Sequence, residues 1–302
     1  MPPALISHPL FREYRLPEIH PDQPRRIEAV EDRLIASGLD LLLRPFEAPE
    51  VDPGLLQRVH HPEYLAGLAE SIPAEGWTDL DGDTWLTAGA WQAAHRASGG
   101  AALGVDLVLD GTTDTAFVLG RPPGHHARAE RAGGFCLLNH VGVAVARARE
   151  RGVGRIAVLD FDAHLGDGTE SLVGGAPDVR MYSLYQQGGF GAPQERPAGN
   201  IRRLPLPPRA EGEVLREGVE GVFLGDLAAF QPEILLISAG FDGHREDDLS
   251  DLRLVEGDYA WLVRRLLEVS GAPTVFSLEG GYEPAALGRS VHAVLHTLLE
   301  HG

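Results

Sequence analysis

The chain has 302 residues, enough for one large domain with a substantial core, and its hydrophobic fraction of 43% and charged fraction of 23% are ordinary for a soluble globular protein. Its formal net charge of −18 argues against a nucleic-acid-binding surface, which needs a basic patch. No apolar run approaches the ~20 residues of a membrane span, and the only cysteine, Cys136, excludes an intrachain disulfide. The first residues also lack the order of a signal peptide, so we expect a cytoplasmic protein.

The N-terminal part shows few regular patterns. Residues 1–30 are rich in Pro and His and are interpreted as an irregular arm that leads into a helix near Ile27–Ser37. A second helical stretch follows Asp52. The segment Asp79–Thr84 lacks the ligand spacing and terminal glutamate of a calcium-binding EF-hand. We predict a rim loop there, before a helix of small residues at Ala88–Gly104.

From there, short apolar runs alternate with helical stretches. The runs are Thr115–Leu119, Ile156–Leu159, Ile234–Ile237 and Thr274–Leu278. This alternation predicts an α/β domain with a mainly parallel sheet and helices on both faces, and the absence of a linker favours one domain over residues 1–302. Each run ends in an unusually polar loop: RPPGHHA, DFDAHLGDG, SAGFDGH or EGGY. Because parallel strands end at the same edge of a sheet, we expect these loops to form one site at the carboxyl ends of the strands.

The loop after the second run is the richest in possible metal ligands. Asp160, Asp162, His164 and Asp167 follow one another with two glycines between them. Alternation along the strand sends Asp160 and Asp162 to the same side. An aspartate and a histidine two residues apart can bind one divalent cation at roughly 2.0–2.2 Å per bond. Strand-end aspartates also cap helices, but the density of ligands here favours a metal site.

The other loops are ambiguous when each is considered alone, because a histidine pair is often structural and an aspartate such as Asp242 can cap a helix. In this order, however, the four loops resemble those of the zinc-dependent histone deacetylase family, which includes bacterial histone deacetylase-like amidohydrolases and acetylpolyamine amidohydrolases. The segments GGFCLLN at residues 133–139 and Tyr182–Leu184 match as well. The resemblance runs from about His20 to the C-terminal helix and implies a single-domain arginase/deacetylase-like fold.

The resemblance also implies specific roles for individual residues. One catalytic zinc ion is expected to be bound by Asp162, His164 and Asp242. A structural potassium ion is expected at Asp160, Asp162, His164, Ser183 and Leu184. The expected catalytic residues are His125 with Asp160, His126 with Asp167, and Tyr282. The substrate channel is expected to be lined by Gly134, Phe135, Leu249 and, with weaker support, Phe190.

These residue types suit the hydrolysis of an amide. His126 can take a proton from water and later protonate the leaving amine, while its carboxylate partner fixes the imidazole tautomer. The hydroxyl of Tyr282 can donate a hydrogen bond to the developing oxyanion. Arg26 is at the position where relatives carry a basic residue near an internal product channel, although an arginine in an arginine-rich helix is usually solvated.

The chain departs from the family pattern at two places. Leu165 replaces a histidine that commonly follows the zinc-binding one, and we expect this to alter packing around the site rather than abolish activity. After Asp242, the usual Asp-Pro-Leu-Gly becomes Asp-Asp-Leu-Ser at residues 247–250. Loss of the proline favours a looser rim loop. The rim is expected to be acidic, through Glu246, Asp247, Asp248 and Asp251.

The predicted function is removal of acetyl or other acyl groups from amines. Leu249 lies where polyamine-selective relatives carry an acidic residue, which favours acetyl-lysine in peptides or proteins. The acidic rim favours a polycation, so an acetylpolyamine amidohydrolase is the alternative. A dinuclear ureohydrolase is disfavoured because Gly166 and Gly240 occupy positions where a second metal needs carboxylates. A non-catalytic binding protein, an oligomer, and iron in place of zinc are all compatible with the sequence.

Overall fold

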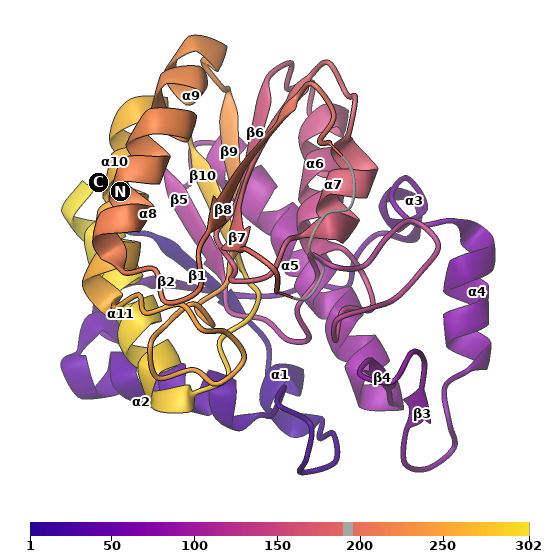
Figure 1. Ribbon diagram of the computed structural model, residues 1–302. Helices are drawn as coiled ribbons and strands as arrows, with labels where there is room; N and C mark the ends of the chain where they lie inside the picture. Colours follow the sequence, from indigo (N-terminus) through magenta and orange to yellow (C-terminus); the bar gives the residue numbers. More distant parts are fainter. Residues whose placement is uncertain (190–195, 302) are drawn as a thin grey trace.

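Buried apolar strands form the centre of the molecule. The computed structural model describes residues 1–189 and 196–301, and eight of their strands make one sheet in the order β2-β1-β5-β10-β9-β6-β7-β8 (Figure 1). The strands are β1 (Ala4–Ser7), β2 (Arg44–Glu47), β5 (Thr115–Val118), β6 (Ile156–Asp160), β7 (Val179–Gln186), β8 (Ile201–Leu206), β9 (Ile234–Ala239) and β10 (Thr274–Leu278). All neighbouring strands in this sheet are parallel. The predicted α/β fold class is therefore confirmed.

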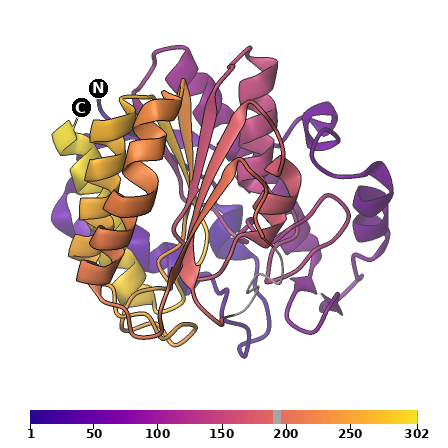
Figure 2. The same cartoon turned by 45° about the horizontal axis from the view of Figure 1, so that its top comes forward.

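Helices cover both faces of the sheet (Figures 1 and 2). One face carries α5 (Ala88–Leu109), α6 (His140–Glu150) and α7 (Asp167–Val173). The other face carries α2 (Arg25–Ser37), α8 (Gly212–Val219), α9 (Gly225–Phe230), α10 (Glu256–Ser270) and α11 (Pro284–His301). Helices on both faces explain why the inner strands are continuous apolar runs. None of the helices in the described ranges is long and apolar enough to cross a membrane.

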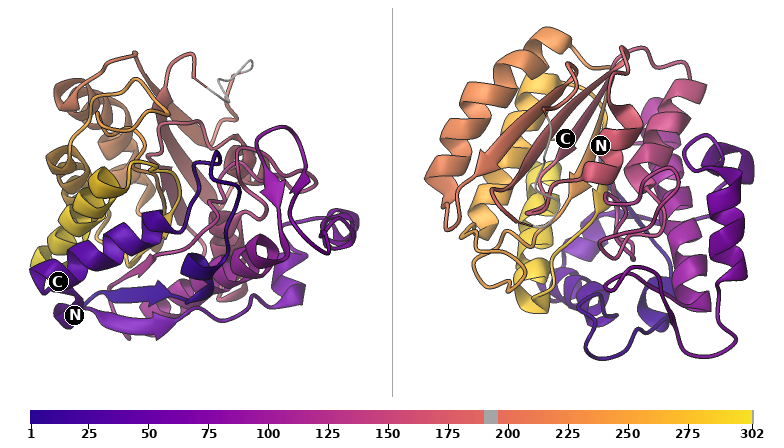
Figure 3. Two further views of the ribbon diagram at one scale, coloured as in Figure 1. Left: turned by 90° about the horizontal axis from the view of Figure 1, so that it is seen from below. Right: turned by 45° about the vertical axis from the view of Figure 1, so that its right-hand side comes forward.

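Shorter elements surround this core. They are α1 (Leu10–Glu13), α3 (Pro53–Leu56), α4 (Pro62–Glu70), the 3₁₀ turn η1 (Leu39–Leu42) and the π turn η2 (Glu220–Leu224). The rim loop that we predicted at Asp79–Thr84 is present and connects the two short strands of an antiparallel hairpin, β3 (Thr78–Asp79) and β4 (Trp85–Leu86). The loops that follow the parallel strands lie at the lower end of the sheet in Figure 1, and Figure 3 (left) shows the molecule from below.

The interpretation of residues 1–30 as an irregular arm is wrong. These residues contain β1, which lies inside the sheet between β2 and β5, and the short helix α1. The strand has only four residues, and only Ala4 and Ile6 are buried, so its alternation is too short to detect in the sequence. The predicted helices are present at Arg25–Ser37, which starts after Pro24, and at Ala88–Leu109, which is five residues longer than expected.

A fully buried carboxylate joins this N-terminal part to the rest of the fold. Asp22 Oδ1 accepts hydrogen bonds from Arg26 Nη1 at 2.7 Å and from Arg121 Nε at 3.0 Å, and Oδ2 accepts one from the hydroxyl of Tyr14 at 2.8 Å. Burial raises the pKa of Asp22, but the Arg121 and Arg26 guanidinium groups outweigh it and hold this pKa well below its usual range. Asp22 therefore stays ionised between two buried cations.

We predict that Asp22→Asn lowers the free energy of unfolding by about 3–5 kcal/mol at neutral pH, because it leaves two buried guanidinium groups uncompensated. Chemical denaturation measures this loss. The control is Asp32→Asn, at an exposed position on α2, where we expect a change of less than about 0.5 kcal/mol. The free energies of unfolding of Asp22→Asn and the parent should approach each other only below about pH 4. In that range Asp22 of the unfolded parent binds a proton, so the parent loses the stability that its ionised Asp22 provides. Equal stability of the two variants would contradict the prediction.

Candidate active site

Three possible metal ligands converge at the ends of two neighbouring strands. Asp162 and His164 follow β6, and Asp242 follows β9, which pairs with β6 in the sheet. His164 Nδ1 lies 3.0 Å from Asp162 Oδ1 and 2.9 Å from Asp242 Oδ2. One ligand atom from each residue lies within 4.8 Å of the other two. Two carboxylates and one imidazole are a donor set that suits zinc, so these residues fit the expected metal.

The backbone holds both carboxylates in place. The N–H of Gly280 donates to Asp162 Oδ2 at 2.9 Å, and the N–H of Ala163 donates to Asp242 Oδ1 at 2.9 Å. A Cβ atom at Gly240 would lie 2.0 Å from Asp162 Oδ2. There is thus no space at Gly240 for the additional carboxylate that a dinuclear site needs.

A similar constraint applies on the other side of the site. A Cβ atom at Gly166 would lie 2.1 Å from Asp160 Oδ2. Both glycines for which the sequence analysis expected no second-metal ligand are therefore in close contact with buried carboxylates, Gly166 with Asp160 and Gly240 with Asp162.

Each histidine of the pair hydrogen bonds to its own carboxylate. His125 Nδ1 lies 3.0 Å from Asp160 Oδ2, and His126 Nδ1 lies 2.8 Å from Asp167 Oδ1. These pairs agree with the ones that the resemblance implied. Asp167 also accepts hydrogen bonds from Arg128, at 2.6 Å from Nη2, a contact that the sequence analysis missed.

The two imidazoles differ in their electrostatic surroundings. Burial, together with the neighbouring charge of His125, lowers the pKa of His126 to about 4. Burial also lowers the pKa of His125, but the Asp162 and Asp160 carboxylates outweigh it and raise this pKa to about 10. Although burial raises the pKa of Asp167, its contacts with His126 and Arg128 lower it to about 2. Asp167 is therefore an ionised acceptor that fixes the Nδ1 proton of His126.

A serine with an unused hydroxyl lies beside Asp160. The sheet register places Ser183 on β7 directly opposite Asp160 on β6. Ser183 is fully buried, and its Oγ atom has no hydrogen-bond partner among the residues that the structure describes. An orphaned hydroxyl beside a buried carboxylate is compatible with the potassium ion that we expected at Asp160, Asp162, His164, Ser183 and Leu184.

A pocket of about 240 Å³ opens above these residues. It is lined by Asp83, His125, His126, Gly134, Phe135, His164, Leu249 and Tyr282. The expected substrate-binding residues Gly134, Phe135 and Leu249 are thus at the pocket, whereas Phe190 lies outside the described residues. Asp83, from the β3–β4 hairpin, was not singled out, although its loop was predicted to lie at the rim.

Two contacts shape the wall of this pocket. The ring of Phe135 packs edge-on against that of Tyr282, with centroids 5.6 Å apart. The backbone N–H of Phe135 donates to Thr84 Oγ1 at 3.1 Å, which connects the wall to the hairpin. Gly134 has a φ of +53°, and a Cβ atom there would lie 2.3 Å from the ring of His126. Glycine is therefore required for the loop to pass beside this histidine.

Tyr282 is positioned by two charged residues. Its backbone N–H donates to Asp247 Oδ2 at 2.6 Å, and the guanidinium of Arg26 lies 4.6 Å from the centre of its ring. Arg26 is fully buried and also donates to the carbonyl of Gly281 at 2.6 Å, so the interpretation of this arginine as a solvated side chain is wrong. Burial raises the pKa of Tyr282 well above its usual range, although Arg26 opposes this shift. The phenol therefore remains protonated and able to donate.

The rim after Asp242 is less acidic than its sequence suggests. Asp247 is buried and directed toward the backbone of Tyr282 and Glu283. Glu246 is paired with Arg289 at 2.8 Å. Asp248 and Asp251 are the exposed carboxylates of this segment that make no ion pair with any residue in the ranges 1–189 and 196–301.

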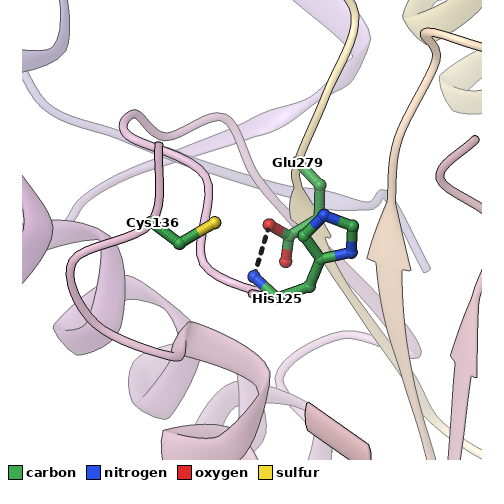
Figure 4. Close-up of side chains that lie close together, drawn as sticks. All are labelled: His125, Cys136 and Glu279. Atoms are coloured by element: carbon green, nitrogen blue, oxygen red, sulfur yellow. Dashed lines mark hydrogen bonds between the residues drawn. The ribbon is translucent and has the colours of Figure 1, made fainter. Parts of the chain in front are cut away.

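Glu279 connects the tyrosine turn to the histidine loop (Figure 4). Its Oε2 accepts hydrogen bonds from the backbone N–H groups of Gly124 at 2.5 Å and His125 at 3.1 Å. Burial raises the pKa of Glu279 to about 7, against the effect of the nearby His125. Cys136 lies close to the same group and is completely buried. The EGGY motif thus contributes a positioning carboxylate, which the sequence analysis did not identify.

We predict that Gly240→Ala reduces the zinc bound per chain to less than about a tenth of the parent value, because the added methyl group displaces Asp162. Elemental analysis of zinc-loaded, folded protein measures the loss. The control is Gly257→Ala on α10, where a Cβ atom meets nothing within 4 Å. Full zinc occupancy in Gly240→Ala would show that Asp162 does not bind the metal in the observed position.

Comparison with known proteins supports one family. The Histone deacetylase domain profile matches residues 20–298. A probable deacetylase of Methanothermobacter thermautotrophicus is 36% identical over 281 residues, which cover 85% of this chain and 82% of that protein. Polyamine deacetylase HDAC10 of Homo sapiens is 32% identical over 322 residues, which cover 98% of this chain and 48% of that protein. The crystal structure of the HDA15 HD domain matches with a TM-score of 0.92 and 26% identity, and covers 98% of this chain and 90% of that one.

Proposed function

Because this chain belongs to the histone deacetylase family, we propose that it is a zinc-dependent amidohydrolase that removes acetyl or related acyl groups from lysine side chains of peptides or proteins. One observation carries the proposal. The cluster of Asp162, His164 and Asp242 lies beside two histidines, each hydrogen bonded to a carboxylate, and a tyrosine that lines the same pocket. This combination supplies a metal site, a base and an oxyanion donor within one pocket.

The metal-binding roles follow from the donor atoms. Asp162, His164 and Asp242 would hold zinc, which when bound polarises a substrate carbonyl and lowers the pKa of a water molecule. Ser183 and the carboxylate of Asp160 would contribute to a potassium site, where the ion's charge would offset part of the buried negative charge. His125 Nδ1 lies 3.0 Å from Asp160 Oδ2, so an ion bound by Asp160 would also help to hold the histidine loop.

His126 is the residue best arranged to move the proton. Its Nδ1 is engaged by Asp167, so Nε2 is the nitrogen that accepts a proton from the attacking water. The same nitrogen then returns the proton to the amine as the C–N bond breaks, and the acid product and the free amine leave. Arg128 holds Asp167 from the opposite side and keeps it ionised throughout.

Tyr282 is arranged to stabilise the developing oxyanion. Its hydroxyl stays protonated, and the Arg26 guanidinium under the ring and the Asp247 carboxylate on its backbone restrict its movement. A preorganised donor of this kind lowers the barrier for the step in which negative charge forms on the carbonyl oxygen.

We predict that Tyr282→Phe lowers kcat by about 100-fold or more, while zinc content and thermal stability stay close to those of the parent. Turnover of an acetyl-lysine peptide by the zinc-loaded protein measures the effect. Tyr185→Phe is the matched control, because Tyr185 is buried on β7 away from the pocket lining and should retain near-normal turnover. Comparable activity of both variants would remove Tyr282 from the mechanism.

The pocket supports lysine as the amine, but a polyamine is a real alternative. Phe135 and the partly exposed Leu249 present apolar surface to a methylene chain, and Leu249 brings no charge to attract a second ammonium group. The exposed Asp248 and Asp251 near the same rim favour a cationic substrate. Similarity to a protein named polyamine deacetylase also supports this alternative.

A side-by-side assay decides between the two substrates. We predict a higher kcat/KM for an acetyl-lysine peptide than for acetylspermidine, with both activities lost on treatment with a chelator. Leu249→Glu should reverse the order, because a carboxylate at the pocket attracts the distal ammonium groups of the polyamine. A parent preference for acetylspermidine would make the polyamine the substrate. Zinc-bound protein without turnover of any acyl amide would identify a non-catalytic binding protein.

A further inference from the structure

A second cleft, lined by arginines, lies behind the rim of the pocket. Its volume is about 640 Å³, and four arginines contribute to its lining: Arg209, Arg216, Arg245 and Arg253. Two loops form it, one between β8 and α8 and the other between β9 and α10. Backbone hydrogen bonds join these loops, from Arg253 N–H to the carbonyl of Ala210 at 2.9 Å and from Arg209 N–H to that of Asp251 at 3.0 Å. A cleft of this size suits a small molecule.

Three of these guanidinium groups are not neutralised. Arg209, Arg245 and Arg253 are exposed, and their side chains make no ion pair or hydrogen bond within residues 1–189 and 196–301. Arg216, in contrast, donates to Asp258 at 2.7 Å. The cleft lining carries four arginines against three carboxylates, Glu211, Glu213 and Asp258, so it has a small excess of positive charge on a chain whose net charge is −18.

Arg245 and Arg253 lie in the loop between β9 and α10, on either side of the rim segment 246–252. The backbone N–H of Arg245 donates to the carbonyl of Leu254 at 2.9 Å, which closes the loop, and Arg253 precedes Leu254. The rim segment 246–252, which carries the pocket residue Leu249, extends from this closure. A ligand that contacts both Arg245 and Arg253 would therefore hold the two ends of the rim segment together.

We propose that this cleft binds a small oxyanion that carries two or more negative charges, of the phosphate type, and that the bound anion restrains the rim segment 246–252. A guanidinium group binds phosphate through two parallel N–H···O bonds. The exposed carboxylates of Glu211 and Glu213 also line the cleft and weaken the binding of any anion. The ligand must therefore engage more than one arginine, which a single-charge anion such as chloride does poorly.

Thermal unfolding of the purified full chain tests the binding. The ligands are inorganic phosphate and, separately, ribose 5-phosphate, each at about 10 mM and compared with sodium chloride at equal ionic strength. We expect inorganic phosphate to raise the Tm of the parent by about 2–4 °C relative to chloride. A larger shift with ribose 5-phosphate assigns the site to a phosphorylated small molecule, and an equal or smaller shift assigns it to free phosphate.

Two double variants make this test specific. Arg245→Gln with Arg253→Gln should abolish the phosphate-dependent shift. Arg25→Gln with Arg33→Gln changes the net charge equally at exposed positions on α2 and should keep the shift. The absence of a phosphate-specific shift in the parent, or an equal shift in both double variants, would overturn the proposal.

Amide hydrogen exchange tests the effect on the rim. Phosphate should slow exchange at residues 243–255 in the parent and in the α2 double variant, and leave it unchanged in the cleft double variant. Binding without slower exchange would refute the restraint of the rim. Neither measurement depends on turnover, so the result stands independently of the proposed deacetylase activity.

Discussion

The buried contact between Asp22 and two arginines is the constraint on which the active site most depends. Arg121 begins the loop that carries the histidine pair, and Arg26 donates to the carbonyl of Gly281, which precedes Tyr282. One carboxylate therefore connects, through two arginines, the loop that carries His126 to the turn that carries Tyr282. Burying three charges is costly, and their mutual pairing is what offsets the cost. The result is a rigid connection between the N-terminal segment and two loops that are far apart in the sequence.

The parallel sheet supplies the second constraint. Because β6 and β9 are adjacent and parallel, Asp162 and Asp242 reach the same edge from positions 80 residues apart in the chain. Carboxylates crowded at one edge repel one another, and the site contains backbone N–H donors, such as those of Gly280 and Ala163, that point at them. Glycine also makes this crowding possible. Because Gly240 has no side chain, its backbone can approach Asp162 more closely than that of any other residue.

The residues that gather at the candidate site are easier to predict from the sequence than the outer elements of the fold. Polar residues at the end of an apolar run can be recognised in a sequence, so Asp162 and His164 were recognised from the loop pattern, whereas Asp242 was assigned only through the family resemblance. The strand β1 was missed because four residues with two buried side chains give no usable period. Arg128 and Glu279 were missed because their roles depend on distant partners, Asp167 and the backbone of Gly124, to which no local pattern points.

Contacts with distant residues also explain why the rim is less acidic than its sequence suggests. Four acidic residues within six positions form one negative patch in the sequence, yet each side chain has a separate environment in the fold. Asp247 points inward and receives three backbone N–H groups, from Leu249, Tyr282 and Glu283. Asp247 thus holds the turn that contains Tyr282 and adds little to the negative electrostatic potential at the mouth of the pocket. The remaining exposed carboxylates, Asp248 and Asp251, lie in the chain between two exposed arginines, Arg245 and Arg253. A cation that approaches this rim therefore meets a mixed surface rather than the uniformly acidic one that the sequence suggested.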